Sequence, residues 1–291
     1  MKAGLLVWPA MFVTALSVAS ESIDAQSSLD SLSREVAQRT ASYVDRRVAI
    51  AEGYRRVGTD FPGMGEHWLH PRTLLQGTVD ASHPTLLTYA VIDGAPKLLG
   101  VGFLLTTHSD SARVDAPGWP NAWHEHSGLL TDESGARVGT TKSLSSSTRV
   151  WVLHIWTQLR NPNGNYTPDN WALPFARLGI RAPPNIDADA ARALSLAVGG
   201  DSFLLDILSY SGLRDSATAV AVDAALDTAR ASAERVAAGA RTAAVVSPAD
   251  VAALQGIWRS LADSLRGVLG ATVDILLARP HAAHNEPPSS R

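Results

Sequence analysis

The sequence contains no cysteine among its 291 residues. A chain without cysteine has no disulfide, no thiolate metal ligand and no cysteine that could carry a lipid anchor. Any metal must therefore be held by histidine, aspartate, glutamate or methionine. The sequence also lacks an excess of positive charge, since its formal net charge is −3 at pH 7. Without a large basic field to neutralise phosphates, we expect no nucleic-acid partner.

Several enzyme signatures are missing as well. The sequence has no GxSxG, no GxxxxGK[ST] and no HExxH, so a hydrolase elbow, a nucleotide-binding loop and a zinc-protease helix have no support. The segment NPNGNYTPDN (161–170) offers oxygen atoms for calcium but departs from the spacing of an EF-hand loop. The composition, 45% hydrophobic and 18% charged, is that of an ordinary soluble globular protein.

The N-terminus has the pattern of an export signal. Lys2 provides a short positive start, residues 3–19 are mostly apolar, and Ile23 and Ala25 occupy the −3 and −1 positions of a cleavage after Ala25. The alternative is an uncleaved membrane anchor, but the apolar run is short for a span and Pro9 interrupts it. We therefore predict a signal peptide over 1–25, a periplasmic or extracellular location and no stable membrane span in the mature chain.

Hydrophobic periodicity predicts an α+β fold. In residues 29–56, apolar side chains recur at spacings near three and four, which indicates one long amphipathic helix. The segments TLLTYAVID (85–93) and KLLGVGFLLTT (97–107), joined by Asp93-Gly94, predict a β-hairpin. A third segment, RVWVLHIWTQL (149–159), is apolar on both faces and predicts a central, buried strand. We expect the long helix to pack on a small, mostly antiparallel sheet.

The composition changes near residue 186 towards alanine, leucine, valine, aspartate and arginine. Asp187 is suited to cap one helix and Asp201 a short second one that ends at Gly212. An alanine-rich third helix is expected over residues 215–244, and Ser247-Pro248 begins the last. These features predict a C-terminal helical bundle. The predicted divisions of the chain are a signal peptide (1–25), a His- and Trp-rich α+β domain (27–182), a helical module (186–278) and a disordered tail (279–291).

The histidines are the most informative residues for function. In NAWHEHSG (121–128), His124 and His126 lie two residues apart, so an extended chain directs both to one face. Such a pair can bind one Zn or Cu ion through two imidazole nitrogens. His67, in an expected loop, and His154, on the expected buried strand, are further candidate ligands. The alternative is that the HxH pair arose by chance and that His154 is a hydrogen-bonded core residue.

The tryptophans suggest a second kind of site. Four of them lie in or beside expected loops, where flat amphipathic rings can line a pocket for a sugar or another small ligand. These candidate ligand-binding residues are Trp68, Trp119, Trp123 and Trp171. The alternative is that they fill the core of the sheet, as we expect of Trp151 and Trp156 on the strand.

Several short motifs occur in a fixed order along the chain. They are Gly53-Tyr54, Met64-Gly65-x-His67-Trp68, a leucine-rich hairpin, Leu153-His154-x-Trp156 and Asn161-Pro162-x-Gly164. Over residues 36–178 this order resembles an uncharacterised family of exported bacterial proteins, a domain of unknown function. The resemblance implies an exported location and a shared architecture, and it implies no activity. It includes His67 and His154 but not the HxH pair, and Asn170-Trp171 stands where the family pattern has a second Asn-Pro.

Together these features predict an exported, non-enzymatic binding protein for a divalent metal, Cu or Zn. The expected ligands are some of His67, His124, His126 and His154. A metal-dependent enzyme with one open coordination position is the alternative, with Glu66 or Glu125 as the candidate base. A third hypothesis is an assembly protein whose C-terminal helices form a homo-oligomer. The metal hypotheses depend on whether the histidines converge in the fold.

Overall fold

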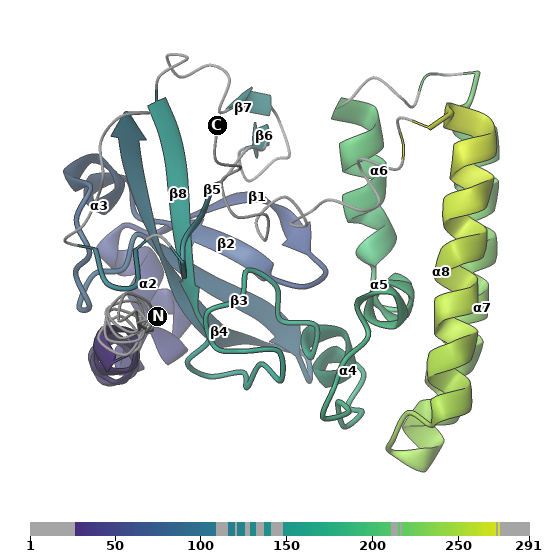
Figure 1. Cartoon of the computed structure of the whole chain (residues 1–291), viewed down its shortest axis with the longest axis horizontal. Coiled ribbons are helices and arrows are strands. Elements are labelled where there is room, and N and C mark those ends of the chain that lie inside the picture. Colours follow the sequence, from purple (N-terminus) through teal and green to yellow (C-terminus); the bar gives the residue numbers. More distant parts are fainter. Residues whose placement is uncertain are drawn as a thin grey trace, which may run out of the picture.

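The computed structural model describes residues 27–108, 116–119, 121–125, 129–131, 137–140, 148–210, 215, 217–271 and 273. An antiparallel sheet and the N-terminal helices occupy one side of the molecule, and the C-terminal helices occupy the other (Figure 1). The predicted signal peptide, His126 and the predicted tail lie outside the described residues. None of the helices in the described part combines the length and apolar character that a membrane span requires.

The N-terminal segment is divided, where the sequence predicted one helix over residues 29–56. Residues 27–39 are helical, a 3-10 helix η1 spans Ala41–Val44, and helix α2 spans Arg46–Glu52. Asp45 caps α2, because its carboxylate accepts a hydrogen bond from the Arg47 backbone N–H at 3.0 Å. Gly53, with φ of 109°, ends α2 in the left-handed conformation. The α+β class is confirmed, whereas the single long helix is not.

The breaks between the helical pieces of the N-terminal segment direct Tyr43 into the core. Its hydroxyl donates to Glu52 at 2.5 Å, and its backbone carbonyl accepts from the Tyr89 hydroxyl at 2.6 Å. The next residue, Val44, is 52% exposed, although it is one of the apolar residues of the 29–56 segment. The apolar spacing continues across the breaks because each short piece contributes to one core, so periodicity alone does not reveal them.

Six strands form the main sheet, in the order β1-β2-β3-β4-β8-β5 with every neighbouring pair antiparallel. The strands are β1 (Arg55–Phe61), β2 (Gly65–Leu69), β3 (Leu86–Ile92), β4 (Ala95–His108), β5 (His124–Glu125) and β8 (Thr148–Ile155). A separate pair contains β6 (Leu129–Thr131) and β7 (Arg137–Thr140). The predicted hairpin and third strand are confirmed. Asp93 and Gly94 both have positive φ, as a two-residue type I′ turn requires.

Strands β1 and β2 were not expected, because the sequence predicted a loop for MGEHWLHP (64–71). Strand β1 is an edge strand of the sheet, and its register with β2 shifts between Val57 and Asp60. Gly58 and Gly65 adopt positive φ at this irregularity and at the start of β2. Irregular, glycine-containing edge strands carry little of the alternation that identifies a strand in sequence.

The two faces of the sheet have different neighbours. One face packs on the N-terminal helices through Leu87, Tyr89, Val101, Phe103, Leu153 and Ile155, all of which are buried. On the other face a smaller apolar cluster joins Met64, Ala90, Leu99, Trp156 and Leu173.

Gly100 on β4 lies against β8, and a Cβ at this position would stand 2.5 Å from the Ile155 carbonyl oxygen. The sheet therefore requires glycine there.

In the described part of the chain, five helices follow the sheet. They are α4 (Leu173–Arg177), α5 (Ala188–Leu196), α6 (Gly200–Tyr210), α7 (Ala219–Ala243) and α8 (Pro248–Leu269). Helices α7 and α8 lie side by side as an antiparallel pair (Figure 1). Asp187 caps α5 and Ser247 caps α8, as predicted, and Ser247 also forms a capping box with Asp250. Their shared core begins at Trp171 and includes Leu194, Leu226, Ala233 and Leu261.

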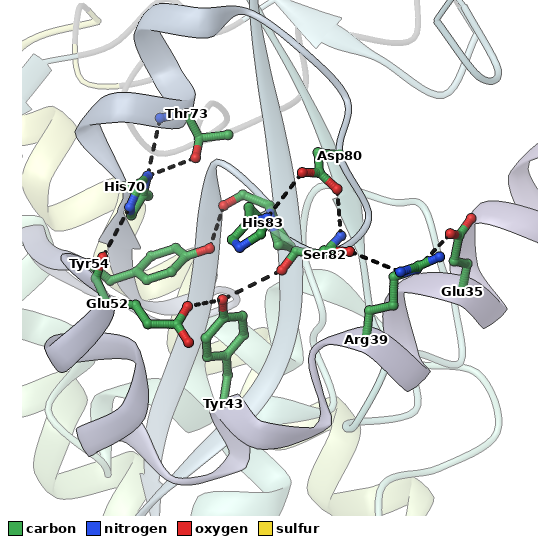
Figure 2. A network of polar contacts seen from close by, with 11 residues as sticks. Glu35, Arg39, Tyr43, Glu52, Tyr54, His70, Thr73, Asp80, Ser82 and His83 are labelled. Atoms are coloured by element: carbon green, nitrogen blue, oxygen red, sulfur yellow. Dashed lines mark hydrogen bonds and ion pairs between the residues drawn. The ribbon is translucent and has the colours of Figure 1, made fainter.

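His70 connects two helices, α2 and α3, through its two ring nitrogens (Figure 2). It is the N-cap of α3 (Pro71–Gln76), and its Nδ1 accepts from the Thr73 backbone N–H at 3.1 Å. Because Nδ1 accepts, Nε2 carries the hydrogen and donates to the Glu52 carbonyl at 3.2 Å. The ring also packs against Tyr54, with centroids 5.0 Å apart. This histidine is a structural link between α2, α3 and the core.

We expect His70→Ala to lower the free energy of unfolding by about 1–2 kcal/mol, because it removes a helix cap and a second hydrogen bond. His70→Asn retains a capping side chain and should recover part of this loss. His83→Ala is the matched control, because His83 is exposed beside Asp80. Urea unfolding measures all three, and an equal loss in the His70→Ala and His83→Ala variants would contradict the role of His70.

Gly100→Ala should destabilise the protein by at least about 2 kcal/mol, because the new methyl group would overlap the backbone of β8. Gly239→Ala is the control, since a Cβ at this exposed position of α7 meets nothing within 4 Å. Replacing glycine inside a helix should raise stability by about 0.5–1 kcal/mol. Urea unfolding should show a lower free energy of unfolding for Gly100→Ala and a higher one for Gly239→Ala. A Gly100→Ala variant as stable as the wild type would overturn this account.

Candidate functional site

The strand register places three histidines on one face of the sheet. His67 on β2 is paired with Thr88 on β3, and Gly102 on β4 is paired with His154 on β8. Directly opposed residues of antiparallel strands project to the same face, as do residues two apart on one strand. On β5, His124 is paired with Val152, two residues from His154. The register therefore aligns the histidines across the sheet in what we call the histidine row: His67, His154 and His124.

The rings of the histidine row lie close together. The centroids of His67 and His154 are 6.0 Å apart with nearly perpendicular planes, and those of His124 and His154 are 5.3 Å apart with nearly parallel planes. No side chain on β4 separates His67 from His154, because Gly100 and Gly102 occupy that strand between them. His124 and His154 are buried, while His67 is partly exposed. The structure thus brings together three of the four predicted ligands.

Aromatic side chains enclose the row. The Phe61 ring stands perpendicular to His67 at 4.8 Å, and the Trp156 ring lies nearly parallel to His154 at 5.9 Å. The indole N–H of Trp156, the residue after β8, donates to the Thr167 carbonyl at 2.8 Å and attaches the 161–170 segment there. Asn161 holds that segment further, by donating to the Asp169 carbonyl at 2.7 Å. The motif residues around His67 and His154 therefore form one contiguous region.

The spacing of the rings is compatible with a shared metal ion. Two imidazoles that bind one metal at about 2 Å per bond place their ring centres about 5 Å apart. The His124–His154 separation of 5.3 Å is already close to this value, and the His67–His154 separation of 6.0 Å exceeds it by about 1 Å. Among the described residues, no three His, Asp or Glu side chains are already gathered as ligands. Binding would therefore require the rings to rotate toward a common point.

Glu66 does not face the histidine row. As the neighbour of His67 on β2, it projects to the opposite side of the sheet. Glu66 is buried there, and its carboxylate accepts from Arg46 at 3.0 Å and from the Trp68 indole N–H at 3.2 Å and lies 3.5 Å from Arg56. This buried charge is neutralised by two arginines and joins α2 to the sheet. Glu125 is paired in register with Trp151.

Three of the four candidate tryptophans, Trp68, Trp119 and Trp123, pack in the core on the N-terminal helix side of the sheet, and Trp171 lies in a different core. Trp119 and Trp123 lie together, with centroids 5.8 Å apart, and Trp119 also contacts Trp151 at 4.9 Å. Trp68 packs beneath the Arg46 guanidinium, 5.1 Å from the ring centre. Trp171 is buried in the core of the C-terminal helices, where Arg192 covers its ring at 5.1 Å. The structure gathers Trp119 and Trp123 on the core side of the sheet and places Trp171 elsewhere.

Asp169 is a titratable group that the sequence did not single out. It lies at the end of the 161–170 segment, and a Cβ on Gly63 would stand 3.2 Å from its carboxylate. Burial raises the pKa of Asp169 to about 7, and the positive charge of Arg192 opposes this shift. An aspartate in a polar turn segment is ordinarily solvated, so no local signal could have revealed the perturbed group.

Comparisons of the chain with protein-family models, with curated proteins and with solved structures found no match. The resemblance to a family of exported proteins therefore stays a prediction. The functional hypothesis rests on the geometry of the histidine row and on the composition of the chain.

The raised pKa of Asp169 predicts a pH-dependent stability. A carboxyl with a pKa of about 7 when folded and about 4 when unfolded binds more protons in the folded state, so stability falls as pH rises from about 4 to 7. Asp169→Asn removes this dependence and should stabilise the protein more at pH 8 than at pH 4. Asp93→Asn, in the exposed hairpin turn, is the control for urea unfolding at both pH values. If Asp169→Asn raised the free energy of unfolding equally at pH 4 and pH 8, the raised pKa of Asp169 would be contradicted.

Proposed function

We propose that this protein is an exported, non-enzymatic binding protein for a divalent transition metal, Cu or Zn, held by His67, His124 and His154. The observation that supports the proposal is the close spacing of the three imidazoles on one face of the sheet. These residues come from three strands that are far apart in sequence. The apolar and aromatic neighbours of the row provide the enclosed surroundings in which a metal is shielded from water.

The ligand chemistry favours these two metals. Imidazole nitrogen suits Zn and Cu, whereas Mg and Ca prefer oxygen ligands. The chain has no cysteine, so thiolate sites for soft metals are excluded. His67 is the partly exposed member of the row and provides the side from which an ion enters. His126, two residues from His124, stays a candidate for a further ligand.

Binding without catalysis is preferred over metal-dependent hydrolysis. A hydrolytic centre needs a general base within reach of the bound water. Glu66, the candidate base next to His67, is held on the opposite face by Arg46 and Arg56. The export signal predicted over residues 1–25 is consistent with a role in metal capture outside the cytoplasm.

Metal analysis of the purified protein tests the proposal. After incubation with Zn or Cu at neutral pH and removal of free ions, we expect one equivalent of metal per chain. His67→Ala, His124→Ala and His154→Ala should each weaken binding by more than about tenfold, since even second-shell partners of metal ligands contribute about 10–100-fold. His83→Ala should bind like the wild type, because His83 is exposed and paired with Asp80.

The wild type and all variants need circular dichroism spectra of a folded protein before affinities are compared. Absence of stoichiometric metal in the folded wild type would overturn the proposal. Normal binding by both the His67→Ala and His154→Ala variants would also overturn it, because a bound ion would then lie elsewhere.

A further inference from the structure

Thr88 lies beside the histidine row, opposite His67, and has a buried hydroxyl. It is 1% exposed, and its Cα is paired in register with that of His67 on one side and that of Gly100 on the other. Directly opposed residues have Cβ atoms about 4.5–5.5 Å apart and project to one face. The hydroxyl therefore stands on the face that carries His67 and His154, between the strands that bear them.

The Thr88 hydroxyl has no hydrogen-bond partner in the described structure. A buried hydroxyl that makes no hydrogen bond costs free energy, and such groups in folded proteins call for an explanation such as a bound water, an ion or a ligand. Valine has the same shape without this cost. The hydroxyl thus gives the histidine face a polar atom that the fold itself does not use.

We infer that Thr88 positions the exogenous ligand, a water molecule or a small anion, that completes a three-histidine metal centre. This inference rests on the proposed metal binding. Three protein ligands leave the fourth tetrahedral position to a non-protein ligand. A threonine hydroxyl both donates and accepts, so it can hydrogen-bond bound water or a bound anion. Gly100 and Gly102 of β4 carry no side chain that would separate the hydroxyl from His154.

In this arrangement the fourth position of the metal centre selects small ligands that carry a hydrogen-bonding atom. Thr88 does not bind the metal in this arrangement, so it should change the affinity of the fourth ligand and leave the affinity of the metal almost unchanged. That separation distinguishes a positioning residue from a residue that only packs. It also distinguishes Thr88 from the histidines, whose loss should remove the metal.

Cobalt is a suitable probe, because Co(II) replaces Zn and its visible spectrum reports coordination. We expect the full chain to bind one Co(II) and to show the intense bands of a tetrahedral centre, which change as azide is added. Thr88→Val should retain Co(II) and weaken azide binding by about fivefold, the effect of one hydrogen bond. Thr88→Ser restores a hydroxyl and should bind azide like the wild type.

Thr85→Val is the matched control. Thr85 is 0% exposed and its hydroxyl also lacks a partner in the described structure, but it precedes β3 and lies outside the histidine row. Replacing it tests the effect of removing a buried, unpartnered hydroxyl without touching the site. Azide affinity should be the same in this variant as in the wild type.

The outcomes separate the two proposals. If the wild type binds Co(II) and azide but Thr88→Val binds azide equally well, the role of Thr88 is wrong while metal binding stands. If Thr85→Val weakens azide as much as Thr88→Val, or if Thr88→Val loses Co(II), the hydroxyl acts through packing and the inference is overturned. If the wild type binds no Co(II), the proposed function fails and the inference fails with it.

Discussion

The register of β2, β3, β4 and β8 is the constraint on which the rest of the structure depends. A shift by one residue would exchange the two faces of a strand, so the core leucines and the histidines are positioned by the same pairing. Two close backbone approaches hold that register. A Cβ on Gly65 would lie 2.3 Å from the Tyr89 carbonyl oxygen, and one on Gly100 would lie 2.5 Å from that of Ile155. Only glycine permits both contacts.

Charged groups attach the sheet to its neighbours at the edge formed by β1 and β2. Glu66 binds Arg46 of α2, and Asp60 of β1 accepts two hydrogen bonds from Arg177 of α4, at 2.6 and 2.8 Å. Burial raises the pKa of Asp60, and the guanidinium of Arg177 opposes that rise. These pairs compensate buried charge while they orient the helices on both sides of the sheet. Their geometry leaves the histidine face without the carboxylate of Glu66.

Polar rings on a buried face require a physical reason. The face opposite the N-terminal helices could have been filled with leucine and valine, as the other face is. Instead it carries His67, Thr88 and His154 at the middle of the sheet. Aromatic contacts with Phe61 and Trp156 account for the orientation of two rings but not for their polarity. Under the proposed function, metal binding is the reason for the polarity and the clustering of these rings.

Local sequence determined the elements with strong local signals. The hairpin at Asp93-Gly94, the strand around His154, the caps at Asp187 and Ser247 and the α+β class all follow from turn chemistry, alternation and capping, which act over a few residues. Local pattern did not reveal the break at Asp45, because the apolar spacing continues across it. It did not reveal the irregular strands β1 and β2 either, because their glycines are equally compatible with a loop. The convergence of His67, Thr88, His124 and His154 was decided by the tertiary structure alone. Strand register joins residues that are distant in the chain, and no local propensity encodes which strands become neighbours.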